Sequence, residues 1–379
     1  MGYKNLVCIM NNRNYGSIIS MLFFKPENII FIIDEDIKSN EHYEEISKFL
    51  KINYPQINCS RRCVKKINNN YLGNVLEEFN SDDTIISLFG DKAKAILMVY
   101  IKARELELKC VYIDNKDDTI LFIDEDKEVS ISEIDMDIHD FIGIAGGEIL
   151  EENSKIFDDE RFINMSKFIM NNRREWETFK RIKRNYDITN WDRTRLDIVQ
   201  FITIKLSNSE YSTLMMFLKE LRNNSIGKIS SRNKERITFK FTNNSCKDFI
   251  GKVGTWLEVL TYDAIKDLGF IDDAKAGVVF LWDRKEEDIK NEVDVLASYS
   301  SNLIYISCKD TSHYDSDTLN ELEVYAKKIG GKTVKKILVV TKESYKSTTS
   351  DRAKEMGISL IIFDEDFYKF KKSLKQVIE

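Results

Sequence analysis

The sequence predicts an α/β protein of three parts: a strand–helix domain over residues 1–147, a helical connector over 148–245 and a second α/β domain over 246–379. Three observations support this fold class. A chain of 379 residues exceeds one typical domain. Short apolar runs alternate with helical stretches in its first third. In its last third the predicted order is helix, three strands, helix and strand, which indicates a second sheet packed against helices.

The first domain has the pattern of a doubly wound sheet. We expect strands over residues 5–10, 28–33, 84–89 and 110–113, helices over 15–24, 41–52 and 93–107, and a trailing hairpin from 119–123 and 129–131. Strands that alternate with helices form a mostly parallel, Rossmann-like sheet. Such sheets bind ligands beyond the carboxyl ends of their strands.

Two strand ends of this domain carry residues suited to a phosphate-containing ligand. These residues are Asn11, Asn12 and Arg13 after the first strand, and Ser87, Gly90, Asp91 and Lys92 after the third. Gly90 allows close approach of the backbone, the following helix offers free N–H groups, and Lys92 adds positive charge. An ordinary strand-to-helix turn with a solvated Lys92 explains the same residues. The Gly-x-Gly-x-x-Gly fingerprint is absent, so NAD is a poor candidate.

The middle of the chain indicates a connector with a basic helix. An acidic, glycine-containing stretch places its start near residues 148–159. We expect helices over residues 161–184, 193–205 and 211–222, then a hairpin from 225–230 and 236–242. The first helix carries Arg173, Arg174, Lys180, Arg181, Lys183 and Arg184. Helices followed by a hairpin resemble a winged helix, which could contact a nucleic-acid backbone. A solvated cationic face explains the same charges.

The last third carries the strongest chemical signal. We expect a helix over residues 248–268, strands over 278–282, 292–296 and 303–308, a helix over 318–329, a strand over 336–341, a helix over 351–356 and a strand over 358–363. This order places Glu258 on the first helix, Asp294 on the second strand and Lys309 at the end of the third. Two carboxylates that can hold a hard divalent cation, with an ammonium nearby, suit metal-dependent phosphodiester hydrolysis. A structural ion-pair cluster at a sheet edge is the alternative.

Residues 248–363 resemble the restriction-endonuclease-like, PD-(D/E)xK nuclease fold. Asp294 and Lys309 match its motif, and Ser307 stands where an acidic residue is usual. The resemblance implies Mg²⁺ or Mn²⁺ held by Glu258, Asp294 and the carbonyl of Cys308, with Lys309 stabilising the transition state. Further residues that could support the site are Glu292, Ser307, Glu321 and Tyr325.

The combination of domains resembles the CARF–nuclease fusions of type III CRISPR defence. The usual Thr-Gly-Gly-Thr-Lys loop of the CARF domain is present here as Leu88-Phe89-Gly90-Asp91-Lys92, so the glycine and the lysine match. The resemblance implies a homodimer that binds a cyclic oligoadenylate, usually cyclic tetra-adenylate, between its CARF domains. It further implies that this ligand activates cleavage of single-stranded DNA and/or RNA and nicking of duplex DNA.

Two other functions stay open. One is a ligand-independent nuclease of DNA repair or mobile elements, whose first domain serves dimerisation. The other is a sensor or scaffold with a decayed nuclease site, which Ser307 suggests. The first predicts cleavage without an activator, and the second predicts no cleavage at all.

Composition argues against several classes of protein. A net charge of −6 disfavours a protein that coats nucleic acid nonspecifically, but it permits a local basic groove. No stretch approaches the ~18 apolar residues of a membrane span, and the first residues lack a signal peptide's apolar core. We therefore expect a cytoplasmic protein with no membrane partner. Six scattered cysteines without a CxxC pair and three histidines without a shared motif give little support for a zinc site or a histidine-based mechanism.

Overall fold

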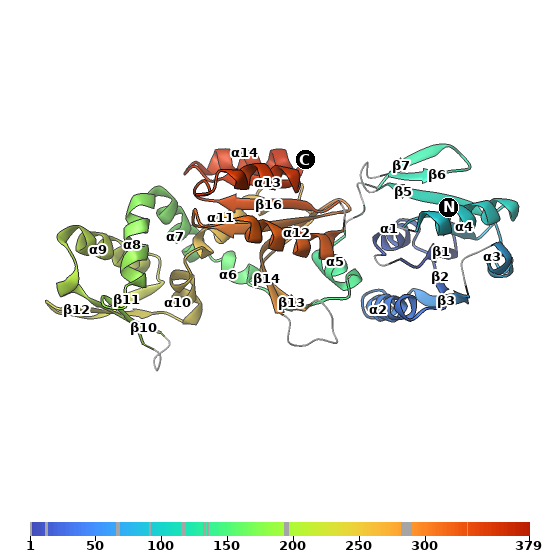
Figure 1. Cartoon of the computed structure of the whole chain (residues 1–379). Coiled ribbons are helices and arrows are strands. Elements are labelled where there is room, and N and C mark those ends of the chain that lie inside the picture. The colour runs from blue at the N-terminus through green and yellow to red at the C-terminus, as the bar shows by residue number, and fades with distance from the viewer. Residues whose placement is uncertain are drawn as a thin grey trace.

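A computed structural model describes residues 2–11, 14–65, 69–90, 92–114, 119–131, 134, 136–192, 197–281, 290–331 and 333–379 (Figure 1). The described chain folds into three sheets with their helices. Figure 1 shows that the C-terminal domain lies between the N-terminal domain and the middle domain, although the middle domain precedes it in sequence. In the part of the chain that is described, no helix has the length and apolar character needed to cross a bilayer.

The N-terminal sheet has the strand order β3-β2-β1-β4-β5-β6-β7. Its strands are β1 (Asn5–Ile9), β2 (Asn28–Asp34), β3 (Asn58–Val64), β4 (Thr84–Ser87), β5 (Lys109–Asp114), β6 (Thr119–Phe122) and β7 (Lys127–Ser130). Its helices are α1 (Tyr15–Phe24), α2 (Ile37–Asn53), α3 (Asn69–Leu76) and α4 (Ala93–Glu105). The first five strands pair in parallel, and β6 and β7 form an antiparallel hairpin. The predicted Rossmann-like sheet is confirmed.

The chain order reverses between β1 and β4, which are neighbours in this sheet. From β1 the chain continues to β2 on one side, and from β4 it continues to β5 on the other. The loops after β1 and β4 therefore border the crevice in which a doubly wound sheet holds its ligand. These are the two loops that the sequence singled out.

The C-terminal sheet has the order β17-β16-β15-β14-β13-β8. Its strands are β8 (Glu148–Glu151), β13 (Asp273–Leu281), β14 (Lys290–Tyr299), β15 (Asn302–Lys309), β16 (Lys335–Val340) and β17 (Ile358–Ile362). Its helices are α5 (Ile138–Ile144), α10 (Asn244–Gly251), α11 (Thr255–Lys266), α12 (Ser316–Gly330), α13 (Thr348–Glu355) and α14 (Phe367–Ile378). The helix α11 packs with α14 on one face, and α12 packs with α5 on the other. The strand β8 joins this sheet through antiparallel pairs with β13.

The expected single helix over residues 248–268 is wrong. The chain leaves helical geometry at Lys252, whose ψ is 136°, and α11 starts afresh after Gly254. Glu258 consequently lies in the first turn of a helix instead of its middle. The helix α14, which the sequence analysis did not predict, caps the same face; the Asp366 side chain accepts from two backbone N–H groups at its start.

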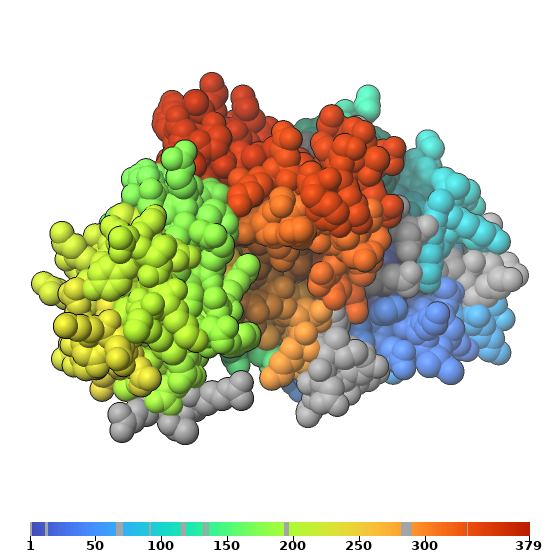
Figure 2. All heavy atoms as spheres, turned by 60° about the vertical axis from the view of Figure 1, so that its left-hand side comes forward, coloured from blue at the N-terminus to red at the C-terminus, as the bar shows by residue number. Residues whose placement is uncertain are grey.

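The middle domain combines helices with a four-stranded sheet of order β11-β12-β10-β9. Its elements are α6 (Ser154–Phe157), α7 (Glu160–Asn171), α8 (Arg173–Arg184), β9 (Thr189–Trp191), β10 (Ile198–Ile202), η1 (Thr203–Lys205), α9 (Asn208–Asn223), β11 (Gly227–Arg232) and β12 (Arg236–Phe241). The predicted hairpin is present as β11 and β12. The predicted helix over 193–205 is wrong in its described part, because residues 198–202 alternate in burial and pair as a strand. Figure 2 shows the green part of this domain directly against the orange and red C-terminal domain.

Candidate active site and ligand loops

Asp294 is held in place by the neighbouring strand. Its Oδ2 atom accepts a hydrogen bond from the backbone N–H of Cys308 at 2.6 Å and from the hydroxyl of Ser307 at 3.1 Å. The antiparallel register of β14 and β15 brings these residues together. Burial raises the pKa of Asp294 despite the nearby Lys309 ammonium and these hydrogen bonds. The two hydrogen bonds therefore fix the direction of the Asp294 carboxylate. The Lys309 ammonium does not fully offset the cost of burying its charge.

Asp294 and Lys309 line the same small cavity, of about 60 Å³. The strands contribute Glu292, Asp294, Tyr305, Ser307 and Lys309, and α12 contributes Thr318, Glu321 and Tyr325. The structure thus brings together the candidate residues of β14, β15 and α12 except Cys308, whose backbone N–H contacts Asp294 but which does not line the cavity. Glu321 and Tyr325 reach it because they are one helical turn apart.

Glu258 lies on the other side of Glu292. It lines a neighbouring cavity of about 150 Å³ with Lys252, Thr255 and Glu292, and Glu292 borders both cavities. Burial, then the negative charges of Asp294 and Glu292, raise the pKa of Glu258 to about 8. Glu258 and Asp294 are thus within electrostatic range, and each disfavours the ionised form of its neighbours.

These groups fit a hard divalent cation. Carboxylate and carbonyl oxygens are the donors that Mg²⁺ and Mn²⁺ prefer, and a cation would offset the burial and the negative charges that raise the pKa of Glu258. The Cys308 thiol is unsuited, because burial raises its pKa well above the ordinary range; only its carbonyl remains as a donor. In the described ranges, no three Asp, Glu, His or Cys side chains converge closely enough to form a metal cluster. Among the described residues, Glu258, Asp294 and the Cys308 carbonyl are the donors that the sequence assigned to the cation, and Glu292 borders both cavities beside them.

We predict a pH-dependent stability that a metal reverses. The pKa of Glu258 is raised on folding, so between about pH 5 and pH 8 the folded protein retains a proton that the unfolded chain releases. The metal-free protein should lose stability as the pH rises through this window. Thermal unfolding at pH 5, 6.5 and 8 measures the loss. Mn²⁺ should raise the melting temperature most at pH 8, and Glu258→Gln should flatten the pH dependence and diminish the Mn²⁺ effect. Identical pH profiles for wild type and Glu258→Gln would contradict the assignment.

Asn11 and Gly90 join the two loops of the N-terminal domain that the sequence predicts to bind a ligand. The buried Asn11 amide donates to the carbonyls of Ile9 and Phe89, both at 2.8 Å. Gly90 has a φ of +148°, and a Cβ there would lie 2.1 Å from Asn11 Oδ1. Within the described chain, that Oδ1 atom has no hydrogen-bond donor. The glycine is therefore required for the close approach of the two loops, and the buried Asn11 Oδ1 atom is left as an unused acceptor among the described residues.

The other candidates of these loops have different surroundings. Lys92 forms an ion pair with Asp34 at 3.3 Å, at the end of β2. The hydroxyl of Ser87 is buried and hydrogen-bonds to that of Ser20 at 2.8 Å, so it faces α1 instead of the crevice. The remaining candidates, Asn12, Arg13 and Asp91, lie outside the described residues.

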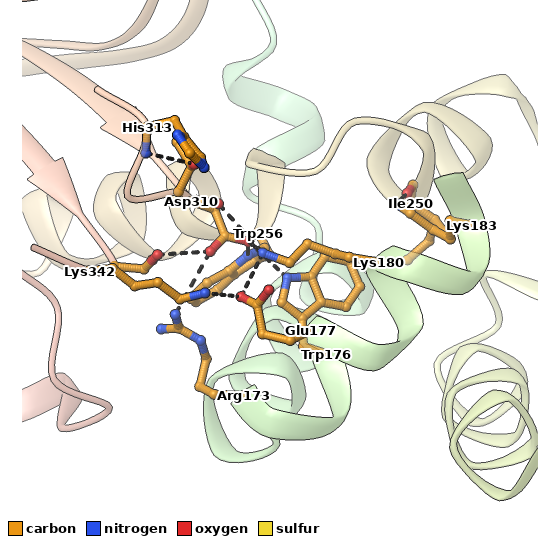
Figure 3. A network of polar contacts seen from close by, with 12 residues as sticks. Arg173, Trp176, Glu177, Lys180, Lys183, Ile250, Trp256, Asp310, His313 and Lys342 are labelled. Atoms are coloured by element: carbon orange, nitrogen blue, oxygen red, sulfur yellow. Dashed lines mark hydrogen bonds and ion pairs between the residues drawn. The ribbon is translucent and has the colours of Figure 1, made fainter. Parts of the chain in front are cut away.

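Two acidic residues next to these sites were not predicted from the sequence. Asp34 ends β2 and partners Lys92, and its position after an apolar run was a usable signal. Asp310 follows Lys309 directly and gathers partners from three other segments (Figure 3). No local pattern identified it, because those partners are distant in sequence.

Comparisons with known proteins agree with this architecture. Residues 249–378 match the family model described as the Card1-like endonuclease domain, which confirms the nuclease resemblance of this region. No curated protein matches the sequence significantly.

Three solved structures share the fold over nearly the whole chain. Protein VC1899 from Vibrio cholerae has a TM-score of 0.80 at 20% identity, covering 98% of this chain and 97% of that chain. Can2 from Sulfobacillus thermosulfidooxidans, in complex with cyclic tetra-adenylate, has a TM-score of 0.68 at 15% identity, covering 99% and 97%. A type III CRISPR defence DNA nuclease activated by cyclic oligoadenylate has a TM-score of 0.56 at 13% identity, covering 98% of this chain and 52% of that one, so this chain spans about half its length. The predicted fold class is confirmed.

Proposed function

We propose that this protein is a metal-dependent endonuclease of type III CRISPR defence, activated by cyclic tetra-adenylate bound between the N-terminal domains of a homodimer. The observation that carries the proposal is the shared cavity of Asp294 and Lys309, with Asp294 fixed by the Cys308 N–H and with Glu258 within electrostatic range. The ligand is suggested by the fold shared with Can2, which was solved with cyclic tetra-adenylate.

Each residue has a distinct role in the proposed reaction. Glu258, Asp294 and the Cys308 carbonyl would hold Mg²⁺ or Mn²⁺, which when bound supplies Lewis-acid polarisation of the phosphodiester and acidifies water. Ser307 and the Cys308 N–H orient the Asp294 carboxylate. Lys309 places an ammonium against the phosphate and stabilises the negative charge of the transition state. Glu321 and Tyr325 border the cavity from α12 and orient the substrate.

The substrates are proposed to be single-stranded DNA and/or RNA, with nicking of duplex DNA. The test uses labelled single-stranded DNA, single-stranded RNA and supercoiled plasmid, each with Mn²⁺ and cyclic tetra-adenylate. We expect cleavage of a single-stranded substrate and conversion of supercoiled plasmid to the open circle. Intact substrates in all three assays would overturn the proposal and favour a decayed sensor, for which the serine at position 307 is the supporting observation.

A direct contact supports communication between sensor and nuclease. Tyr15 begins α1 immediately after the loop that contains Asn11, and its hydroxyl donates to the carbonyl of Ile329 in α12. The Tyr15 ring also packs against Phe141 of α5, with ring centroids 5.8 Å apart. Because α12 carries Glu321 and Tyr325, a shift of the ligand loop has a route to the nuclease cavity.

We predict that Tyr15→Phe weakens activation without weakening ligand binding. The change removes the hydrogen bond to Ile329 but keeps the ring, so activation by cyclic tetra-adenylate should fall roughly 3- to 10-fold. The measurement is the ratio of cleavage rates with and without ligand, beside calorimetry of ligand binding. Tyr43→Phe is a matched control, because that hydroxyl donates at 3.5 Å to the Cys59 carbonyl within the sensor domain. Unchanged activation in Tyr15→Phe would exclude this route.

A two-fold homodimer is part of the proposal. A cyclic oligonucleotide with internal symmetry is most simply bound by two copies of one loop. Sedimentation should show a dimer at micromolar concentration, and a monomer both with and without cyclic tetra-adenylate would count against the shared ligand site.

A further inference from the structure

Asp310 is a buried carboxylate immediately after Lys309. Its side chain is 1% exposed. Its Oδ2 atom accepts from the indole N–H groups of Trp176 and Trp256, at 2.9 Å and 3.0 Å, and from the Lys180 ammonium at 3.1 Å. Its Oδ1 atom accepts from the Thr341 hydroxyl at 2.9 Å. A buried carboxylate is costly unless its oxygens are satisfied in this way.

The donors come from three segments that are distant in sequence. Trp176 and Lys180 lie on α8 of the middle domain, and Trp256 lies on α11 (Figure 3). Thr341 directly follows β16. Trp256 stands two residues before Glu258. One carboxylate therefore links the strand that ends in Lys309 to the helix that carries Glu258.

A second layer of contacts holds α8 against the carboxylate. Glu177 bridges Lys180 and Lys342, at 2.7 Å and 2.8 Å. The Arg173 guanidinium lies over the Trp256 ring, 4.9 Å from its centroid, and 3.7 Å from Asp310 Oδ1. The inward-facing cations Arg173 and Lys180 of α8 thus both contact Asp310 of the nuclease domain. Part of the positive charge of the basic helix α8 therefore lies against the nuclease domain instead of facing solvent.

We propose that Asp310 is a positioning residue for the nuclease and that the middle domain supports it through α8. The carboxylate fixes the end of β15 relative to the start of α11, and so sets the placement of Lys309 relative to Glu258. This inference rests on the proposed nuclease function. A purely stabilising residue would change only the fraction of protein that is folded. A positioning residue instead requires the cleavage rate of the folded protein to depend on Asp310.

The primary test is Asp310→Asn, which keeps the shape of the side chain and removes its charge. Lys180 retains Glu177 as a partner in this variant. With saturating cyclic tetra-adenylate and Mn²⁺, we expect kcat to fall about 10- to 100-fold, with KM and ligand affinity changing less than about 3-fold. An unchanged kcat in folded Asp310→Asn would overturn the proposal. So would a lower melting temperature with full activity per folded molecule.

Milder variants protect the test against a failure of Asp310→Asn to fold. Trp176→Phe and Trp256→Phe each remove one N–H donor and keep an aromatic ring, and each should lower kcat by about 3- to 10-fold. Trp191→Phe is the matched control, since that indole donates to the Lys183 carbonyl at 3.4 Å within the middle domain. Wild-type kcat values in both Trp176→Phe and Trp256→Phe would contradict the proposal.

A readout independent of cleavage separates this inference from the proposed function. Calorimetry of Mn²⁺ binding should show about 3- to 10-fold weaker affinity in Asp310→Asn than in wild type, because Glu258 is displaced from Asp294. Equal Mn²⁺ affinities would overturn the positioning role even if the wild type is an active nuclease. A wild type that binds Mn²⁺ but cleaves nothing would overturn the proposed function and leave this comparison valid.

Discussion

Replacing Asp294 with asparagine should reduce metal-dependent cleavage by at least about 100-fold. The amide oxygen can still accept from the Cys308 N–H, so local structure is kept, but the charge that would hold the cation is lost. Because burial raises the pKa of Asp294, the folded metal-free protein already disfavours its charge. We therefore expect Asp294→Asn to be as stable as wild type, or more stable, in the absence of metal.

The assay compares initial cleavage rates with melting temperatures measured in EDTA. Asp263→Asn is a suitable control, because Asp263 is on α11 like Glu258 but pairs with Lys167, at 3.7 Å, outside both cavities. It should cleave at the wild-type rate. Wild-type cleavage by folded Asp294→Asn would remove this residue from the active site.

Replacing Lys92 with glutamate should weaken cyclic tetra-adenylate binding by roughly 10- to 100-fold. The change removes a cation at the strand end that borders the crevice and places a carboxylate beside Asp34, its present partner at 3.3 Å. A two-fold dimer would apply the change twice to one anionic ligand. Activation should fail at ligand concentrations that saturate wild type and recover in large excess, because the nuclease site is untouched.

Lys94→Glu provides the same change of charge two residues away, on the exposed side of α4. Its ligand affinity should stay close to wild type. If calorimetry gives equal affinities for Lys92→Glu and Lys94→Glu, the loop after β4 is an ordinary turn. The ligand-independent nuclease would then be the better account.

Local patterns predicted the elements that hold the candidate active site. Asp294 lies within β14 and Lys309 ends β15, and the apolar residues of both strands predict their strand character; the helix α1 lies where its apolar spacing predicts. The edge strand β3 was missed because its sequence contains two arginines and its side chains are mostly only half-buried. The strand β10 was mistaken for a helix because its apolar residues also suit a helical spacing.

Long-range arrangement could not be predicted from the sequence in the same way. The partners Trp176 and Lys180 lie 134 and 130 residues from Asp310, and the contact from Tyr15 to Ile329 spans 314 residues. These contacts depend on the C-terminal domain lying between the other two, an order in space that differs from the order in sequence (Figure 1). The contact of Tyr15 is the basis of the proposed activation route, and the contacts of Asp310 are the basis of its proposed positioning of Lys309.

The most direct test of a cation-dependent, ligand-activated nuclease is one rate measured under four conditions. Cleavage of labelled single-stranded DNA, and in parallel of RNA, is followed with Mn²⁺ or EDTA, each with and without cyclic tetra-adenylate. We expect rapid cleavage only where Mn²⁺ and the cyclic nucleotide are both present. Equal rates with and without the cyclic nucleotide, or cleavage that persists in EDTA, would contradict it.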